Sequence, residues 1–190
     1  IEDVRRRAKN IIIDLSKNKS LLIHQKLTGH LLLGKWKRIG EKWESVFAGP
    51  LKDDPKNRFL HLIFWLNDGN MLALSDLRKF AKVELWDSSE LKISKELNNL
   101  GPEPLEKSFT FEKFKEVLLQ IRDKARKGKI KQVLMDQTVI SGIGNIYSDE
   151  VLWWAKIYPL KDVSKLSQIQ LKEIYTAIRK ILPLAVKLQG

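Results

Sequence analysis

The spacing of apolar residues changes near residues 101–104, and this change constrains the fold of the chain more than any other feature. The sequence there, Gly-Pro-Glu-Pro, interrupts helices and strands because proline fixes φ and has no amide hydrogen. Short apolar runs separated by turn residues precede it, whereas apolar residues recur every three or four positions after it. The sequence therefore predicts an α+β protein, with a β-rich domain at residues 1–90, a linker at 91–108 and an all-α domain at 109–190.

The first 90 residues contain segments typical of antiparallel hairpins. A polar turn at residues 16–19 separates two apolar runs, and Asn-Asp-Gly-Asn at residues 67–70 separates two more. The Asp-Gly pair favours a tight hairpin turn, because glycine accepts a positive φ there. Several short strands joined by turns indicate a sandwich or a barrel, and we expect a β-sandwich-like domain. The expected strands are residues 9–15, 20–24, 59–66, 71–74 and 83–86.

The C-terminal part has the period of amphipathic helices. Phe111, Phe114 and Leu118 recur at helical spacing, and Thr110 precedes them as the expected N-cap. Residues 142–145, Gly-Ile-Gly-Asn, interrupt the helical pattern. The expected helices are residues 111–121, 130–137, 146–155 and 167–182, the last of which ends before Pro183.

Composition excludes several classes of protein. Without cysteine the chain has no disulfide, thiolate nucleophile or cysteine-ligated zinc, and its three histidines are too scattered for a metal site. No apolar run approaches the roughly 18 to 20 residues that cross a bilayer. The first residues, Ile-Glu-Asp-Val-Arg-Arg-Arg, lack the apolar segment of a signal peptide. We therefore expect a soluble intracellular protein with no metal or cofactor of its own, and the absence of an initiator methionine suggests that the natural N-terminus lies upstream.

The tryptophans and histidines have structural interpretations. We expect most of the six tryptophans to lie in the core, including Trp153 and Trp154, which fall on a predicted helix. His24, His30 and His61 lie among apolar residues, and we interpret them as structural.

Positive charge is the strongest functional signal in the composition. Lysine plus arginine number 35 against 23 acidic residues, so the net charge is +12 and the pI is about 9.8. This balance favours a polyanionic partner such as nucleic acid, although the alternative is that the charge only keeps the protein soluble. The densest cationic cluster is residues 122–131, with six cations in ten positions, and smaller clusters are Arg5–Lys9 and Asp76–Phe80.

Each cluster allows a functional and a structural interpretation. The glycine turn at residues 142–145 follows the densest cluster and can bring backbone amides close to a phosphate, with Asn145 either capping the next helix or binding a phosphate oxygen. The alternative is an ordinary helix cap. Arg5–Lys9 is either a phosphate contact or a solvated strand edge. Asp76–Phe80 either holds phosphates and inserts a ring between bases, or is a turn with a core anchor.

Residues 134–150, Leu-Met-Asp-Gln-Thr-Val-Ile-Ser-Gly-Ile-Gly-Asn-Ile-Tyr-Ser-Asp-Glu, resemble the helix–two-turn–helix segment of the formamidopyrimidine-DNA glycosylase family, bacterial enzymes that remove oxidised purines from DNA. Endonuclease VIII shares this architecture, but the Asn-Ile-Tyr-x-Asp-Glu run and Gly-Pro-Glu-Pro are closer to the purine-specific branch. The resemblance implies a β-sandwich-like domain followed by an all-α helix–two-turn–helix domain. Four further motifs match the family in order, namely Arg6–Lys9, Leu22–Gly29, Asp76–Phe80 and Leu100–Leu105.

The resemblance also implies a role for individual residues. Lys9 matches a lysine that the family places in its active site, near the phosphate and sugar of the damaged nucleotide. Leu27, Arg78 and Phe80 match the void-filling residues, which enter the duplex where the base has been extruded. The residues matched to DNA contacts are Arg78, Arg126, Lys131 and Asn145. Damaged double-stranded DNA is therefore the expected partner, bound by a monomer.

The sequence departs from the family at both ends and at several motif positions. The family begins with a proline nucleophile followed by a catalytic glutamate and ends with a four-cysteine zinc finger, and neither has a match here. We therefore expect a fragment that is inactive by itself. Smaller departures are leucine for methionine at Leu27, leucine for proline at Leu77 and lysine for arginine at Lys79. Leucine keeps a similar volume, whereas lysine keeps the charge but loses bidentate geometry.

The resemblance predicts the core of a base-excision-repair enzyme of the bacterial cytoplasm, associated with the nucleoid through DNA. The intact enzyme would excise oxidised purines such as 8-oxoguanine and formamidopyrimidines, then nick the strand by β,δ-elimination. One alternative is a non-catalytic module that binds damaged or abasic DNA. A second alternative is an RNA-binding or ribosome-associated module.

Overall fold

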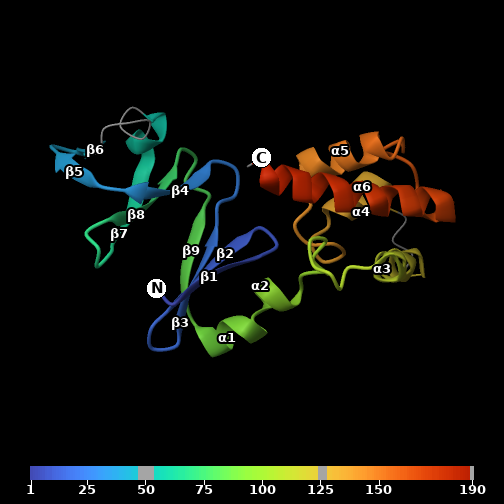
Figure 1. The fold of residues 1–190 in the computed structure, drawn as a ribbon, viewed down its shortest axis with the longest axis horizontal. Helices are drawn as coiled ribbons and strands as arrows, with labels where there is room; N and C mark the ends of the chain where they lie inside the picture. Colours follow the sequence, from blue (N-terminus) through green and yellow to red (C-terminus); the bar gives the residue numbers. More distant parts are fainter. Residues whose placement is uncertain (47–53, 124–127, 189–190) are drawn as a thin grey trace. The chain divides into compact units, whose positions relative to one another are not determined.

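The computed structural model describes residues 1–46, 54–123 and 128–188, and it divides into two compact units, Ile1–Ser88 and Ser89–Gly190 (Figure 1). The first unit consists of antiparallel sheets and the second of helices. The predicted α+β class is therefore correct. Two short helices occur where the sequence predicts a linker at 91–108: α1 (Ser88–Ile93) extends into its start, and α2 (Lys95–Asn98) lies within it.

A four-stranded antiparallel sheet with the order β1-β2-β3-β9 forms one layer of the first unit. In its register Ile13 lies opposite Leu21 and Ile11 opposite Ile23, so the alternating apolar residues share one face. The turn between β2 and β3 places Lys17 and Asn18 at positive φ, as a tight hairpin requires. The strands of this sheet are β1 (Asp3–Arg7), β2 (Asn10–Leu15), β3 (Lys19–His24) and β9 (Lys82–Asp87).

A three-stranded sheet with the order β4-β8-β7 forms the second layer. Leu31, Phe64 and Leu72 of this sheet pack against the apolar face of the first sheet, so the two sheets form a sandwich, as predicted. Its strands are β4 (Gly29–Gly34), β7 (Leu60–Trp65) and β8 (Met71–Asp76). The two-stranded ribbon β5 (Trp36–Ile39) and β6 (Lys42–Ser45) and the short 3-10 helix η1 (Pro55–Phe59) complete the unit.

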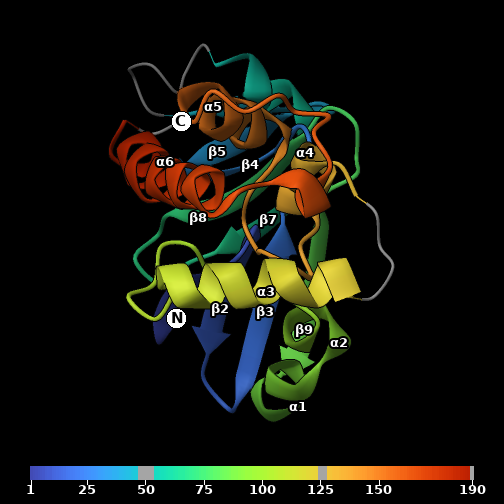
Figure 2. The ribbon, with the colours of Figure 1, turned by 90° about the vertical axis from the view of Figure 1, so that its right-hand side faces the viewer.

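The second unit buries the apolar faces of its helices in a core of its own, which includes Phe114, Leu118 and Ile174. Thr110 caps its first long helix, as predicted, since its hydroxyl accepts a hydrogen bond from the amide of Lys113 at 3.2 Å. Helices α5 and α6 lie side by side in Figures 1 and 2. The elements are α3 (Phe111–Asp123), α4 (Ile130–Met135), α5 (Asn145–Trp154), the 3-10 helix η2 (Val163–Lys165) and α6 (Gln168–Lys187).

The predicted end of the last helix is wrong, because Pro183 lies inside α6. A proline removes one helical hydrogen bond and crowds the carbonyl four residues earlier, but its φ is itself helical. A capping box between Ser167 and Gln170 starts the helix, and the buried residues Leu171 and Ile174 anchor it. The helix therefore continues through the proline, and the amide of Leu188 still donates to the carbonyl of Leu184 at 2.9 Å. 

The prediction that most tryptophans lie in the core is also wrong. Trp36 is 2% exposed, but Trp153, Trp65 and Trp154 are 77%, 67% and 43% exposed. Helix α5 turns a different face to the core, formed by Ser148, Val151 and Leu152, which leaves Trp153 in solvent. In the described parts of the chain, no helix has the length and apolar character to cross a membrane.

Candidate nucleic-acid interface

Two loops cross between the layers of the sandwich at the same end of the first unit. The first loop, residues 25–28, joins β3 to β4, and the second loop, residues 77–81, joins β8 to β9. Strand pairing makes them neighbours, because Gly29 lies opposite Asp76 and His24 opposite Lys82. We call residues 25–28 and 77–81 together the paired loops.

The paired loops expose the side chains that the resemblance matched to void filling. Leu27 is 71% exposed and Phe80 is 58% exposed, although both are large apolar residues. Arg78 lies two residues before Phe80 and is exposed, and within the described residues its guanidinium forms no hydrogen bond or ion pair. Exposed apolar side chains on fixed loops beside a free cation suit insertion into a base stack. In the sequence Leu27 lies in one motif and Arg78 and Phe80 lie in another, and the structure brings the two motifs together.

Both loops have a fixed backbone. Lys26 and Lys79 adopt positive φ angles of 56° and 57°, which residues other than glycine rarely adopt. Gly29 has no room for a side chain, because a Cβ there would lie 2.5 Å from the carbonyl oxygen of Gln25. Strained backbone of this kind is typical of functional loops.

Asp76 is the buried acid at the base of the second loop. A hydrogen bond from the Thr28 hydroxyl, followed by one from the amide of Ala81 at 2.8 Å, lowers the pKa of Asp76 to about 2. The carboxylate is therefore charged throughout the physiological pH range.

Asp76→Asn is expected to remove part of the acid sensitivity of the chain. Because the folded-state pKa of about 2 lies below the ordinary value of 3.8, the stabilisation from this carboxylate is complete above about pH 4 and is lost as the pH falls toward 2. The variant should be less stable at pH 7 and should lose less free energy of unfolding across that window. Urea unfolding at pH 7 and pH 2.5 measures both values, and parallel losses in the two proteins would contradict the prediction.

Lys9 lies at the same end of the sandwich, in the turn between β1 and β2. Ala8 opens this turn with a φ of 53°, and its carbonyl accepts a hydrogen bond from the guanidinium of Arg6 at 2.7 Å. Lys9 is exposed and has no hydrogen-bond partner in the described ranges, while partial burial of its ammonium group lowers its pKa. The guanidinium of Arg5, in the same cluster, is not free to bind an anion, because it forms an ion pair with Asp14 at 2.8 Å.

His24 lies near Lys9 and bonds to the first of the paired loops, a role that the sequence did not reveal. Its Nδ1 accepts a hydrogen bond from the amide of Lys26 at 3.0 Å, which shapes the first loop. Burial lowers the pKa of His24, and the charges of Lys26, Lys9 and Lys82 lower it further. A group of lysines around this imidazole is an environment that attracts an anion. The strand pairing of His24 with Lys82 could be found only from the fold.

In the second unit, the turn between α4 and α5 is held by one side chain. The amide of Gln137 donates to the carbonyls of Met135 and Ile143 at 2.8 Å, and its Oε1 accepts from the amide of Gly142 at 2.9 Å. The segment that holds Gly101 packs directly on this turn, since a Cβ on Gly101 would lie 2.5 Å from the backbone of Val139. These contacts fix the start of α5.

Asn145 does not cap α5, which corrects one of its two predicted roles. Gly144 occupies the N-cap position, and no side chain accepts a hydrogen bond from the first amides of α5. Asn145 is instead the first helical residue, and its side chain is exposed. The positive end of the helix and the Asn145 amide therefore face solvent, which leaves the phosphate-binding role open.

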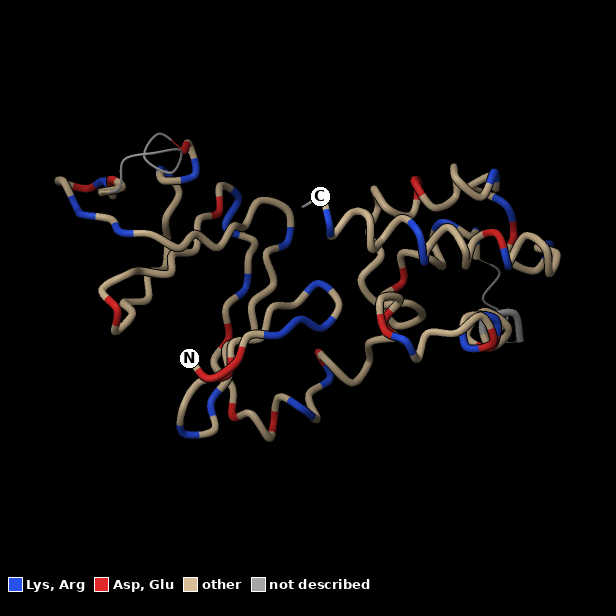
Figure 3. The backbone as a smooth tube through the Cα atoms, in the orientation of Figure 1, with Lys and Arg blue, Asp and Glu red and all other residues tan. Residues whose placement is uncertain are grey.

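The described lysines at the end of the basic run form ion pairs. Lys131 Nζ lies 2.7 Å from Asp149 on α5, and Lys129 Nζ lies 2.8 Å from Asp162. Residues 124–127, which include Arg126, lie outside the described residues, so the structure does not place this predicted contact. Cationic and acidic residues are interspersed along the backbone of both units (Figure 3).

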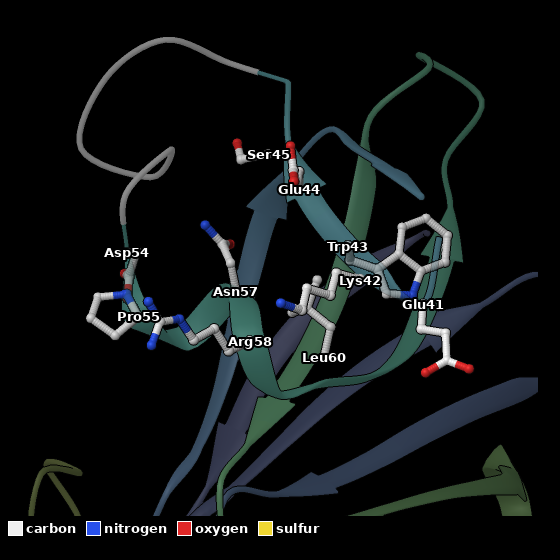
Figure 4. Close-up of a pocket in the computed structure, with 10 residues that line it drawn as sticks. All are labelled: Glu41, Lys42, Trp43, Glu44, Ser45, Asp54, Pro55, Asn57, Arg58 and Leu60. Atoms are coloured by element: carbon white, nitrogen blue, oxygen red, sulfur yellow. The ribbon is translucent and has the colours of Figure 1, made fainter. Parts of the chain in front are cut away.

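A cavity beside the β5–β6 ribbon does not contain the predicted site residues. It has a volume of about 930 Å³ and is lined by residues of β6 and η1, among them Trp43, Asn57 and Arg58 (Figure 4). None of the predicted site residues lines it. Among the residues that the structure describes, no group of three histidine, cysteine, aspartate or glutamate side chains is placed to hold a metal ion.

The fold and the site define a class of protein, in which a β-sandwich with two exposed loops precedes a helical unit. Residues 1–83 match the model of the formamidopyrimidine-DNA glycosylase N-terminal domain, and residues 100–190 match that of the formamidopyrimidine-DNA glycosylase H2TH domain. The chain belongs to the formamidopyrimidine-DNA glycosylase family.

Individual relatives agree with this assignment. The formamidopyrimidine-DNA glycosylases of Herpetosiphon aurantiacus and Carboxydothermus hydrogenoformans are each 36% identical over 100% and 98% of this chain. The chain spans 61% and 59% of the length of these relatives. Solved structures of the Lactococcus lactis family member, in complexes with DNA containing an abasic site or Fapy-dG, match the whole chain with a TM-score of 0.80 at 30% identity, and the chain covers 62% and 63% of them.

Proposed function

We propose that this chain is the DNA-binding core of a base-excision-repair enzyme, a DNA glycosylase with AP lyase activity that excises oxidised purines from double-stranded DNA. The observation that carries the proposal is the exposure of Leu27, Arg78 and Phe80 on the paired loops. The names of the relatives, and the abasic and Fapy-dG DNA held by the Lactococcus lactis structures, support an enzyme rather than a non-catalytic module.

The paired loops would stabilise DNA from which the damaged base has been extruded. Extrusion breaks stacking and base pairing, which costs a few kcal/mol. Leu27 and Phe80 can replace part of the lost stacking, and Arg78 can donate hydrogen bonds to the base left without its partner. Lys131, Asn145 and the start of α5 supply donors and positive charge for backbone phosphates. Arg126 is proposed as a further DNA contact from the family match alone.

Lys9 is the residue of this chain proposed to lie nearest the reacting sugar. Its lowered pKa means that it gives up its proton more readily than an ordinary lysine. We assign it contact with the phosphate and sugar of the damaged nucleotide, and no bond-breaking step. The attack on the sugar and β,δ-elimination are assigned to the proline and glutamate of the family, which have no match in these 190 residues. The proposal includes a monomer in the bacterial cytoplasm and no metal or cofactor held by this chain.

Borohydride trapping on the full-length gene product tests the catalytic part of the proposal. The product is mixed with a duplex that contains 8-oxoguanine, and a covalent adduct is expected because an amine nucleophile forms a reducible Schiff base with the sugar. The 190-residue chain should give no adduct under the same conditions. Absence of an adduct with every oxidised-purine duplex would reject the enzymatic function, and strand cleavage by the chain alone would reject the assignment of the nucleophile.

A further inference from the structure

The carboxylate of Asp76 joins the paired loops, and the function proposed above gives it no task. It is buried, although the four residues after it are exposed. One oxygen accepts hydrogen bonds from the hydroxyl of Thr28 and, at 3.2 Å, from the amide of Arg78. The other accepts from the amide of Ala81 at 2.8 Å. A single carboxylate thus closes the second loop and ties it to the first.

Thr28 has the matching position in the first loop. Its hydroxyl donates to Asp76 and also accepts from the amide of Arg78 at 3.2 Å. The residue before it is Leu27, so the first insertion side chain is one peptide away from the bond between the loops. Arg78 is bonded to both Thr28 and Asp76 through its own amide.

Two histidine rings contact the backbone carbonyls of Asp76 and Thr28. Nε2 of His61 lies 2.9 Å from the carbonyl oxygen of Asp76, and Nδ1 of His30 lies 3.0 Å from the carbonyl oxygen of Thr28. A Cβ on Gly29 would lie 2.9 Å from the Cβ of Ala81, so the loops pack without space between them. The backbone on both sides of the Thr28–Asp76 bond is therefore held in place.

We propose that Asp76 and Thr28 are positioning residues that hold Leu27, Arg78 and Phe80 in one fixed arrangement before DNA is bound. The inference rests on the proposed function, because it concerns how the insertion residues work. Loops that are ordered before binding lose less conformational entropy in the complex, so more of the contact energy appears as affinity. The pair should therefore affect binding to DNA with a vacant base position and leave the phosphate contacts unchanged.

Thr28→Val and Thr28→Ser test the inference on the 190-residue chain. Valine removes the hydroxyl at nearly constant volume, whereas serine keeps it. Affinity is measured by fluorescence anisotropy for an undamaged duplex and for a duplex with a tetrahydrofuran abasic analogue. Thr28→Val is expected to lose about tenfold in affinity for the abasic duplex, the scale of one hydrogen bond, and to bind undamaged duplex as before. Thr28→Ser should stay within about twofold of the unchanged chain in both measurements.

A folded Thr28→Val variant that keeps the full preference for abasic DNA would overturn the inference. If that variant does not fold, Asp76→Asn decides the question, because asparagine keeps the shape of the carboxylate but replaces one of its two acceptor oxygens with an amide donor, so one of the bonds from Thr28 and Ala81 is lost. Asp76→Asn is expected to lose affinity for the abasic duplex and to bind undamaged duplex as before, and an unchanged preference for abasic DNA would overturn the inference. If the chain without any substitution shows no preference for abasic DNA, the proposed function is contradicted instead. Failure of the inference and failure of the proposed function are therefore distinguishable.

Discussion

Phe80→Ala is expected to lower the affinity of the chain for a duplex with an abasic site by about tenfold to a hundredfold. This range follows from the roughly 1 to 3 kcal/mol that stacking of one base on an aromatic ring contributes. Phe80 is 58% exposed on a loop whose backbone is held by Asp76, so truncation removes a contact surface without opening a core cavity. Affinity for undamaged duplex should not change, because no base position is vacant there.

Trp65→Ala is the matched control. Trp65 is an exposed aromatic residue of the same unit, with 67% exposure, but it pairs with Met71 at the end of β8 opposite to Asp76. Trp65→Ala therefore removes a similar exposed aromatic surface, but at the opposite end of the sheet from the paired loops. Fluorescence anisotropy with abasic and undamaged duplexes measures both variants. Equal losses for Phe80→Ala and Trp65→Ala would contradict the insertion role of Phe80.

The sequence predicts the elements of this chain wherever the signal is local. The β2–β3 hairpin has its apolar runs and its turn within one short segment, and α3 has its helical spacing of apolar residues and its N-cap within another. Both form as expected. Strand β1 was missed because its sequence, Asp-Val-Arg-Arg-Arg, has no apolar alternation, and four of its five residues are exposed at a sheet edge. Strand β4 was missed because it pairs with β8, about 40 residues away, and such pairing leaves no local pattern.

The same distinction holds for the candidate site. Motifs identify Leu27 and Phe80 one by one, because each lies in a short recognisable segment. The contact between their loops depends on Thr28 and Asp76, which are 48 positions apart and meet only through the pairing of β4 with β8. The tryptophans show the opposite error, because residue type alone suggested burial. Trp153 is exposed since α5 already fills its place in the core with Val151 and Leu152.

Lys131→Ala is expected to weaken binding to any duplex by about tenfold to a hundredfold, the scale of a lost charge-assisted hydrogen bond. The slope of log affinity against log salt should become shallower by about one unit, because one fewer counterion is released. The substitution also leaves the carboxylate of Asp149, which lies 2.7 Å from Lys131 Nζ, without its partner, and an unpaired negative charge beside the proposed phosphate contact adds to the loss. Titrations at several salt concentrations measure the slope.

Asp149→Asn tests the effect of the carboxylate separately from that of Lys131. The Lys131–Asp149 pair is partly exposed, at 25% and 48%, so it contributes at most about 1 kcal/mol to the free protein, and a phosphate can compete for the lysine. Removing the competing carboxylate should therefore tighten DNA binding by about two- to fivefold. Lys113→Ala, which removes a lysine paired with Glu116 on α3, is the control for net charge. If Lys113→Ala changes the salt slope as much as Lys131→Ala does, the effect is one of total charge, and Lys131 is not a phosphate contact. If Asp149→Asn weakens binding, the carboxylate orients the lysine toward DNA instead of competing for it.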